Sequence, residues 1–318
     1  MSLYPFRLSQ KTVDRLIWIL AGMVLVGLLS FAGYYYWDRY HTRGPSLVDV
    51  ETAHLEEMVR QNPANALLRV EVAKRYMARD MLDAAIQQAN EALKINPSME
   101  EAYLVLGDAY RLKGDLDAAL EQYQQVVELN KNNEFAAINP NLETAYYEIG
   151  EIHLRRGELE AARDAFLEAL KIERTDADAL MGLGITYQRL GNHEEAIATF
   201  RRAIRLVPKF PEAYEAMRVS YDALGQAAGV LYAEGMLAYA RGEPEAALAK
   251  LEEAVNIDPE FLEVYFGLGL VYEELNEVDA AVDALNRYLE AHPDDIAAQF
   301  AIHRLTSVTE PEGERGAK

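Results

Sequence analysis

Residues 102–130 read AYLVLGDAYRLKGDLDAALEQYQQVVELN, and this stretch decides the fold. Gly107 stands in the middle of its first half, and Gly114 separates that half from the second. A small residue inside a helix lets another helix approach closely, and a glycine at a helix end favours a turn. The stretch therefore predicts two short helices that pack together at Gly107, with Tyr123 filling the gap that the glycine opens.

The same arrangement recurs along the chain. Six alanines mark it, and they are Ala85, Ala119, Ala162, Ala196, Ala247 and Ala281. A glycine or alanine precedes each of them by twelve positions, and a large apolar residue follows five of them by four positions. Three of the five steps between the alanines equal about 34 residues, a period that is typical of an array of paired helices. The two longer steps mark inserts, which we place at residues 134–142 and 211–227.

This pattern resembles the tetratricopeptide repeat, and the resemblance covers residues 66–295 in six units. The units begin at residues 66, 100, 143, 177, 228 and 262. In the stretch quoted above, the residues at the signature positions of the family are Tyr103, Leu106, Gly107, Tyr110, Ala119 and Tyr123. The resemblance implies an all-α fold, in which a right-handed helical solenoid of about six full repeats also carries a half-repeat and a capping helix. We expect a single N-terminal transmembrane helix to precede it.

The two inserts set the predicted order of segments. Residues 134–142 loop out or extend a helix, although an insertion that the surface merely tolerates is the alternative. Residues 211–227 amount to half a repeat, so we expect a boundary between two sub-arrays within residues 211–229. The full order is an N-terminal tail (1–15), a transmembrane helix (16–37), a juxtamembrane segment with a capping helix (38–65), repeats one and two (66–133), the insert (134–142), repeats three and four (143–210), the half-repeat (211–227), repeats five and six (228–295), a capping helix (296–307) and a disordered tail (308–318).

The N-terminal region contains an uncharged run over residues 16–37, LIWILAGMVLVGLLSFAGYYYW. At about 1.5 Å per residue, a helix of this length covers a hydrocarbon core of about 30 Å. The aromatic residues 34–37 are of the kind that gathers where a helix leaves the lipid. We therefore expect a membrane-spanning helix. A signal peptide that is cleaved after Ala32 is the alternative, because small residues flank that position.

Basic residues on the two sides of this run predict its orientation. Arg7, Lys11 and Arg15 precede it, whereas Arg39 and Arg43 follow it. With the α-amino group included, positive charge is in excess on the N-terminal side, and such an excess favours the cytoplasm. We expect a single-pass protein of the cell membrane with its N-terminus in the cytoplasm and its repeats on the outer, periplasmic or extracellular face.

The charge of the chain indicates which classes of partner it can bind. The formal net charge is −21, and residues 1–40 carry a net charge of +2, so the remainder carries −23. An acidic surface repels phosphate backbones and attracts basic protein segments, so nucleic acid is not an expected partner. An acidic exterior that serves only solubility is the alternative. Cysteine is absent, which excludes disulfides and thiolate metal sites.

No motif for catalysis or for a cofactor is present. The sequence has neither a glycine-rich phosphate loop followed by Lys-Ser or Lys-Thr nor an HExxH helix. His193 begins a predicted helix without a second ligand at helical spacing, which indicates a solvated helix start and not a metal site. We therefore expect no enzyme activity, no cofactor, no metal ion and no small-molecule substrate.

The resemblance also implies a binding groove, because the family lines its concave face with residues of the first helix of each repeat. Carried over position by position, the candidate partner-binding residues are Tyr147, Met181, Ile185, Tyr232, Met236, Tyr239, Phe266 and Leu270. Aromatic side chains act as anchors, and methionine adapts to an extended peptide or an amphipathic helix. Burial against neighbouring helices is the alternative role of these side chains.

Together these features predict a membrane-anchored scaffold or adaptor that mediates protein–protein interaction or complex assembly at the membrane surface. One alternative is an assembly chaperone that holds an apolar client segment, of the cytochrome maturation, secretion or pilus type. The other is the regulatory arm of a membrane enzyme complex. The expected partners are proteins that offer a basic segment, an apolar helix or an extended segment, together with the lipid bilayer.

Overall fold

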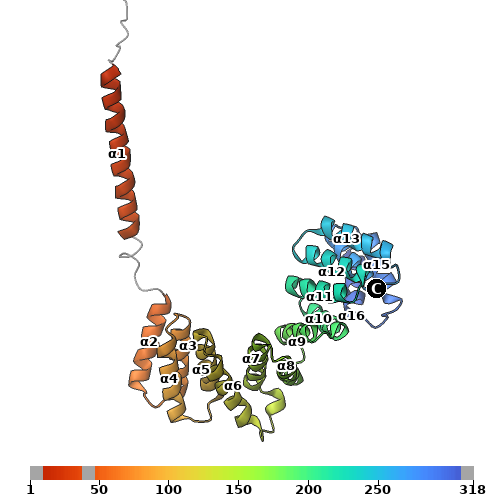
Figure 1. The fold of residues 1–318 in the computed structure, drawn as a ribbon, viewed down its shortest axis with the longest axis horizontal. Helices are drawn as coiled ribbons and strands as arrows, with labels where there is room; N and C mark the ends of the chain where they lie inside the picture. The colour runs from red at the N-terminus through yellow and green to blue at the C-terminus, as the bar shows by residue number, and fades with distance from the viewer. Residues whose placement is uncertain (1–9, 38–46, 309–318) are drawn as a thin grey trace, which may run out of the picture. The chain divides into compact units, whose positions relative to one another are not determined.

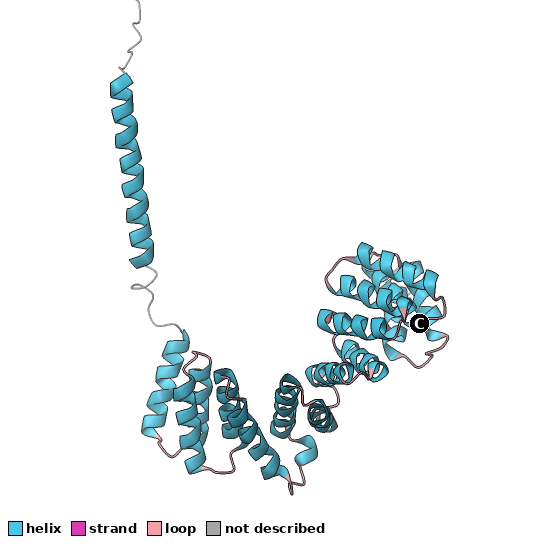
Figure 2. Cartoon of the chain, in the orientation of Figure 1, coloured by secondary structure: helices cyan, strands magenta, loops and turns pink. Residues whose placement is uncertain are grey.

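The computed structural model describes residues 10–37 and 47–308, and all regular structure within them is helical (Figures 1 and 2). An all-α helical-repeat solenoid is thereby confirmed. The ends of the chain and residues 38–46 lie outside the described residues, and with them most of the predicted N-terminal and C-terminal tails and part of the juxtamembrane segment. The chain divides into two compact units, residues 1–96 and residues 97–318.

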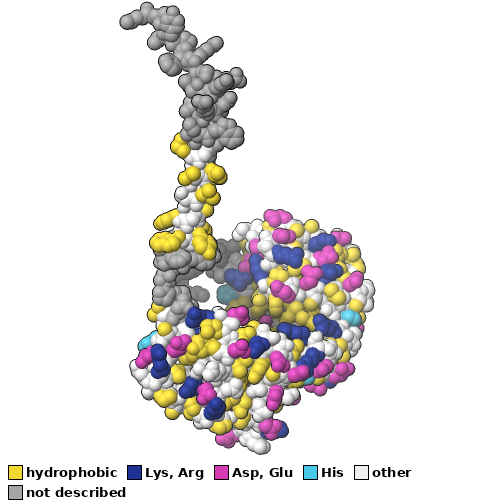
Figure 3. All heavy atoms as spheres, turned by 60° about the vertical axis from the view of Figure 1, so that its left-hand side comes forward, with side chains coloured by type: hydrophobic (Ala, Val, Ile, Leu, Met, Phe, Trp, Pro, Cys, Tyr) yellow, Lys and Arg dark blue, Asp and Glu magenta, His cyan; other side chains and the backbone are white. Residues whose placement is uncertain are grey.

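Helix α1 covers Gln10–Trp37 and contains the uncharged run. Its side chains are described from residue 22 onward, and every large apolar side chain from Met23 to Trp37 is more than half exposed (Figure 3). In the described ranges, no helix is both long and apolar enough to cross a membrane. By this test of length and hydropathy, the transmembrane helix that the sequence predicts over residues 16–37 is not supported.

Three more helices complete the first unit, namely α2 (Leu47–Gln61), α3 (Ala66–Met77) and α4 (Leu82–Ile95). Asn65 begins α3 as an N-cap, because its side chain accepts a hydrogen bond from the Leu68 amide at 3.2 Å. The Tyr76 hydroxyl on α3 donates to Glu56 on α2 at 2.8 Å. Helix α2, which lies inside the predicted juxtamembrane segment, thus packs against the first helix of a repeat pair.

The second unit continues the succession of short helices, and each α-helix packs against the next along the chain (Figure 1). Its elements are α5 (Glu100–Lys113), α6 (Leu116–Asn130), the 3-10 helix η2 (Ala136–Ile138), α7 (Pro140–Arg156), α8 (Leu159–Ile172), α9 (Ala177–Arg189), α10 (His193–Leu206), α11 (Pro211–Ala223), α12 (Ala227–Ala240), α13 (Pro244–Ile257), α14 (Glu263–Glu274), α15 (Val278–Leu289) and α16 (Ile296–Val308).

The two helices of a pair approach each other most closely at the glycine that recurs in the first helix of the repeat. A β-carbon added to Gly107 would lie 2.4 Å from the ring of Tyr123, and one added to Gly184 would lie 2.4 Å from the ring of Phe200. Such distances are far below van der Waals contact, so only glycine permits this approach. The other pairs of the same kind are Gly150–Phe166, Gly235–Leu251 and Gly269–Leu285. The six recurring alanines are all fully buried.

The half-repeat contributes helix α11, which packs against α9 and α10, while α12 packs against both α11 and α13. The side-chain amide of Gln188 on α9 donates to the Ala216 carbonyl at 2.6 Å and to the Ser220 hydroxyl at 2.8 Å. One cluster of buried apolar residues runs from α10 to α15. Packing is therefore continuous across residues 211–229. The division into two compact units falls between residues 96 and 97.

Candidate partner-binding cavity

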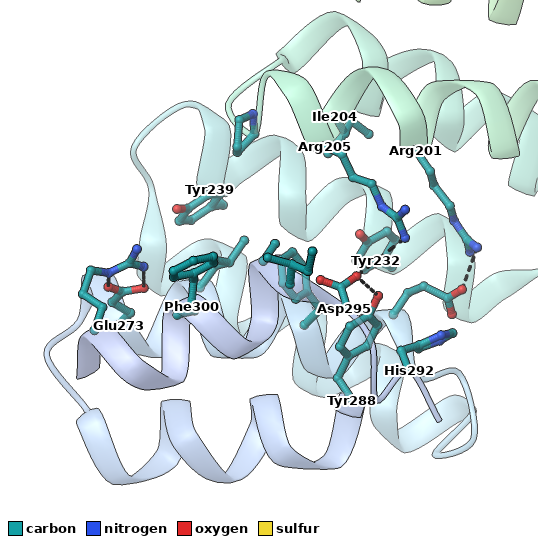
Figure 4. Close-up of a pocket in the computed structure, with 18 of the residues that line it drawn as sticks. Arg201, Ile204, Arg205, Tyr232, Tyr239, Glu273, Tyr288, His292, Asp295 and Phe300 are labelled. Atoms are coloured by element: carbon teal, nitrogen blue, oxygen red, sulfur yellow. Dashed lines mark hydrogen bonds and ion pairs between the residues drawn. The ribbon is translucent and has the colours of Figure 1, made fainter. Parts of the chain in front are cut away.

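A cavity of about 900 Å³ opens in the second unit between α10, α12, α14 and α16. Figure 4 shows Arg201 and Arg205 on α10 at one side of the cavity and Phe300 on α16 at the other. Helices α12 and α14 supply the wall between these two sides, and this volume lies in the range of ligand-binding clefts. We call it the C-terminal cavity.

Four of the eight candidate residues line this cavity. Tyr232 and Tyr239 come from α12, and Phe266 and Leu270 come from α14. Helices α12 and α14 each stand first in their repeat pair, and they pack against each other where Gly267 of α14 meets Met236 of α12. The four side chains come from these two neighbouring helices. The C-terminal repeats therefore bring the predicted aromatic anchors together.

The other four candidates do not line the cavity. Met236 is only 1% exposed and lies in the core, where its sulfur would be 2.8 Å from a β-carbon added to Gly267. Met181 and Ile185 are half-buried on α9 and pack against the core cluster of α10–α15. Tyr147 on α7 is half-buried, with its ring 6.0 Å from that of Phe166. Met236 is therefore buried between helices, which is the alternative role expected for the candidate groove residues.

Helix α16 contributes two cavity-lining residues that are not among the eight candidates predicted from the repeat. Ile296 and Phe300 line the cavity and are each 64% exposed. The opposite face of α16 carries Ala298, Ala301 and Leu305, which pack into the core cluster of α15. The expected capping helix therefore presents an apolar pair at a spacing of four to the cavity. Two apolar residues four positions apart lie on one face of a helix, so the sequence alone could have indicated this pair.

Ion pairs hold the walls of the cavity together. Arg201 on α10 contacts Glu263 on α14 at 2.6 Å. Arg304 on α16 contacts Glu273 on α14 through two bonds of 2.6 and 2.7 Å (Figure 4). Such two-bonded pairs fix geometry as well as charge. They attach both side walls, α10 and α16, to the same central helix.

Asp295, just before α16, connects the cap to the rest of the cavity. One carboxylate oxygen accepts a hydrogen bond from the Ala298 amide at 3.1 Å, which caps α16. The other accepts from the Tyr288 hydroxyl at 3.0 Å and lies 3.6 Å from Arg205 on α10 (Figure 4). Burial and the neighbouring Asp295 carboxylate raise the pKa of Tyr288 to about 12, so this phenol stays a hydrogen-bond donor at neutral pH.

Two tyrosines on α12 give the cavity polar functions. Tyr232 is 6% exposed, and burial raises its pKa, so its hydroxyl remains protonated. That hydroxyl has no hydrogen-bond partner among the described residues, although the side chain lines the cavity. The Tyr239 ring lies under the Lys209 ammonium, 4.7 Å from the ring centroid. The Tyr232 hydroxyl is thus available to a bound segment, since a buried polar group gains from a partner.

The N-terminal part of the predicted groove is occupied by its own side chains. The Tyr123 hydroxyl donates to Asp108 at 2.7 Å, and Arg111 contacts Glu148 at 3.1 Å. Burial raises the pKa of Glu148 and of Glu151. These contacts link α5, α6 and α7.

The carboxyl group of Glu143 on α7 makes the stability of the second unit depend on pH. Burial, followed by a hydrogen bond and repulsion from Asp176, raises the pKa of Glu143 to about 7. A glutamate in an unfolded chain has a pKa of about 4.3, so between these values the folded chain holds a proton that the unfolded chain has lost. Stability therefore falls as the pH rises through this range. We expect Glu143→Gln to raise the thermal unfolding midpoint at pH 8 and not at pH 4.

The control for this variant is Glu160→Gln, at an exposed position of α8. Differential scanning calorimetry at both pH values should show no change of pH profile in the control. A Glu143→Gln variant with the same gain at pH 4 as at pH 8 would contradict the assignment.

The described residues contain no group of three or more His, Asp or Glu side chains arranged to hold a metal ion. His193, which the sequence analysis placed at a helix start, is the first residue of α10. The lining of the C-terminal cavity consists of aromatic and aliphatic side chains together with charged groups, several of which are paired. Its chemistry is suited to holding a polypeptide segment by apolar contact and hydrogen bonds.

Family models for the tetratricopeptide repeat match residues 98–175 and 141–209 in one case and residues 232–296 in another. These matches cover the predicted repeats two to six, apart from the half-repeat. The first predicted unit, which begins at residue 66, lies outside them. No curated protein matches the chain.

Solved structures with the same kind of fold match most of the chain. A structure of the APC/C hetero-tetramer Cut9–Hcn1 is 17% identical with a TM-score of 0.47, over 81% of this chain and 46% of that one. MamA is 25% identical with a TM-score of 0.46, over 61% of this chain and 95% of that one. PilF of Pseudomonas aeruginosa is 14% identical with a TM-score of 0.44, over 78% of this chain and 98% of that one.

The chain thus spans less than half of the Cut9–Hcn1 chain that it matches. With TM-scores below 0.5, these similarities carry no argument about partners or function. The family models, by contrast, match on the repeat motif itself, and together they cover more than half of the 318 residues. The chain belongs to the tetratricopeptide repeat family and is a helical-repeat scaffold of the type suited to protein–protein interaction.

Proposed function

We propose that the C-terminal cavity binds an apolar segment of a partner protein and that the chain acts as a non-catalytic scaffold. The observation that carries this proposal is the pair Ile296 and Phe300, each 64% exposed on the cavity wall of α16. Large apolar side chains that line a cavity and remain open to solvent are typical of interaction sites, because a partner gains free energy by covering them. Tyr239 and Phe266 line the same cavity from α12 and α14.

The charges around the cavity favour a segment with basic residues beside its apolar anchor. Arg201 and Arg304 are already paired with carboxylates of α14. Asp294 is an exposed lining residue without an ion pair or hydrogen bond among the described residues. The net charge of −21 adds long-range attraction for a basic partner. Binding should therefore weaken as the salt concentration rises.

Photo-crosslinking in cells tests this proposal. A photoreactive residue at position 300 should join the partner covalently, whereas one at position 257 should not. Ile257 is the matched control, since it is 53% exposed on α13 and does not line the cavity. The same products from both positions would overturn the proposal. A product found only at position 300 identifies the partner for the affinity measurement described in the Discussion.

We propose further that α1 tethers the scaffold to a membrane, with the N-terminus in the cytoplasm and the repeats on the outer face. The support comes from the sequence of residues 16–37, which lacks charge, and from the excess of basic residues before it. The exposed apolar side chains of residues 23–37 add to it, because a helix that is apolar on all sides requires a cover such as lipid.

Protease accessibility in intact cells measures this arrangement. We expect an external protease to digest the repeats without lysis, while a tag placed before Gln10 stays protected. Recovery of the whole chain in the soluble fraction after lysis without detergent would contradict the tether. Digestion of the repeats only after the membrane is opened would contradict the orientation.

A further inference from the structure

Helix α12 brings two tyrosine side chains to the wall of the C-terminal cavity (Figure 4). Tyr232 and Tyr239 are seven positions apart, so they lie on one face of the helix with their Cα atoms about 10.5 Å apart. Neither hydroxyl has a hydrogen-bond partner among the described residues. Burial raises the pKa of both groups, so each hydroxyl keeps its proton at neutral pH. The wall therefore offers two hydrogen-bond donors.

Tyr232 gives the stronger indication of a ligand, because the residue is only 6% exposed. A buried donor without an acceptor is unfavourable, and a bound group that supplies the acceptor removes this penalty. Tyr214 on the neighbouring helix α11 shows the contrast, since its hydroxyl donates to the Pro208 carbonyl at 3.1 Å. At Tyr232 the cavity thus has a place for a hydrogen-bond acceptor of the bound segment.

The carboxylates inside the cavity, by contrast, are already paired. Three of them belong to α14 and each contacts a cation, in the pairs Glu263–Arg201, Glu273–Arg304 and Glu274–Lys209. Asp295 accepts from the Tyr288 hydroxyl and the Ala298 amide. A segment rich in backbone N–H groups would meet acceptors that are already engaged. A segment with carbonyls and few N–H groups matches the two unpartnered hydroxyls.

A proline-rich segment has this composition, because proline keeps its carbonyl and lacks a backbone N–H. It forms a polyproline II helix, which has no internal hydrogen bonds, whereas an α-helix uses its carbonyls internally. Every third carbonyl of a polyproline II helix lies on the same side, about 9.3 Å apart, close to the spacing of the two tyrosines. In a β-strand, carbonyls on the same side are about 6.6 Å or about 13 Å apart.

The apolar lining suits the same segment. The ring centroids of Phe266 and Tyr288 are 5.2 Å apart, and Phe300, which is 64% exposed, lines the cavity from α16. Proline-rich segments dock in aromatic-lined grooves, since a preformed polyproline II helix loses little entropy on binding. Asp294, an exposed lining residue without an ion pair among the described residues, attracts a basic residue beside the prolines.

We propose that the C-terminal cavity recognises a proline-rich segment in the polyproline II conformation with a basic residue at its end. The hydroxyls of Tyr232 and Tyr239 donate to carbonyls three positions apart on one side of this segment, and its prolines pack on Phe266 and Phe300. The inference rests on the proposed function of the cavity, and it adds the composition and the conformation of the bound segment.

Two synthetic peptides test this inference by fluorescence anisotropy with the full-length chain in a non-ionic detergent. The first is KPPLPPLPPK. The second, KAALAALAAK, keeps the charges and the leucines but carries a backbone N–H at every former proline and favours an α-helix. We expect the proline peptide to bind roughly tenfold more tightly than the alanine peptide, because unpaired N–H groups weaken the binding of the latter.

The variant Tyr232→Phe removes one donor and should weaken binding of the proline peptide by roughly fivefold or more, with an unchanged circular dichroism spectrum. The matched control is Tyr146→Phe, at a half-buried tyrosine of α7 that does not line the cavity, and it should bind as the unaltered chain does. Three results contradict the inference: no binding of the proline peptide, alanine-peptide binding that is equal or tighter, or full affinity in Tyr232→Phe.

Photo-crosslinking from position 300 separates this inference from the proposed function. If the peptides give one of the contradicting results while position 300 still captures a partner, the proline-rich segment is wrong and the proposed function stands. If neither peptide binds and position 300 captures no partner, both fail.

Discussion

Replacing Phe166 by alanine is expected to lower the free energy of unfolding by about 3–5 kcal/mol. The ring of Phe166 on α8 is fully buried. It fills the space over two glycines at once, because β-carbons added to Gly150 on α7 and to Gly182 on α9 would lie 2.8 and 2.4 Å from it. Its removal therefore opens a void among three helices and in two successive repeats. Urea unfolding followed by circular dichroism measures the loss.

The matched control is Phe135→Ala, the same substitution at a side chain that is 61% exposed in the same compact unit. It should change the free energy of unfolding by no more than about 0.5 kcal/mol, as is usual for surface positions. Equal effects of the two variants would show that the glycine and aromatic pairs do not carry the packing of the repeats.

Replacing Asp295 by alanine is expected to release α16 and destabilise the C-terminal repeat by roughly 2–4 kcal/mol, the sum of a lost cap and lost partners. The substitution removes the cap of α16, which contributes about 1 kcal/mol. It also leaves the hydroxyl of Tyr288, a residue that is 6% exposed, without its acceptor, and a buried group that loses its partner costs about 1–3 kcal/mol. Hydrogen exchange of the α16 amides should accelerate, and crosslinking from position 300 should disappear.

The neighbouring residue supplies the control. Asp294 is exposed and makes no hydrogen bond or ion pair with a described residue, so Asp294→Ala should leave the exchange of α16 unchanged. The substitution Asp295→Asn keeps an oxygen acceptor and should retain part of the protection. Unchanged exchange in Asp295→Ala would show that the cap holds its place through apolar packing alone.

The sequence predicts the repeat packing well because the contacts involved are local. Gly107 meets Tyr123, and Gly184 meets Phe200, within a single pair of helices whose spacing the repeat period defines. The left-handed turns at Gly114 and Gly157, with φ of 83° and 77°, follow from the same pattern. Residue type and spacing suffice here, since these contacts join residues that are close in the sequence.

The C-terminal cavity could be predicted only in part. Its walls on α10 and α16 are far apart in the sequence, and the small rotations between successive repeats decide whether they face one another. The carried-over groove positions include Tyr232 and Phe266, which line the cavity. They missed Phe300, because a terminal helix has no counterpart in the repeat, and they included Met236, which the close approach of Gly267 buries.

The central claim is that a partner segment occupies the C-terminal cavity, and one affinity measurement tests it most directly. The partner identified from position 300 is titrated by calorimetry into the full-length chain and into the Phe300→Ser and Ile257→Ser variants. Truncation of an aromatic anchor costs about 2 kcal/mol or more, so Phe300→Ser should weaken binding by roughly thirtyfold, whereas Ile257→Ser should bind as the unaltered chain does. Equal affinities of the two variants would contradict the claim.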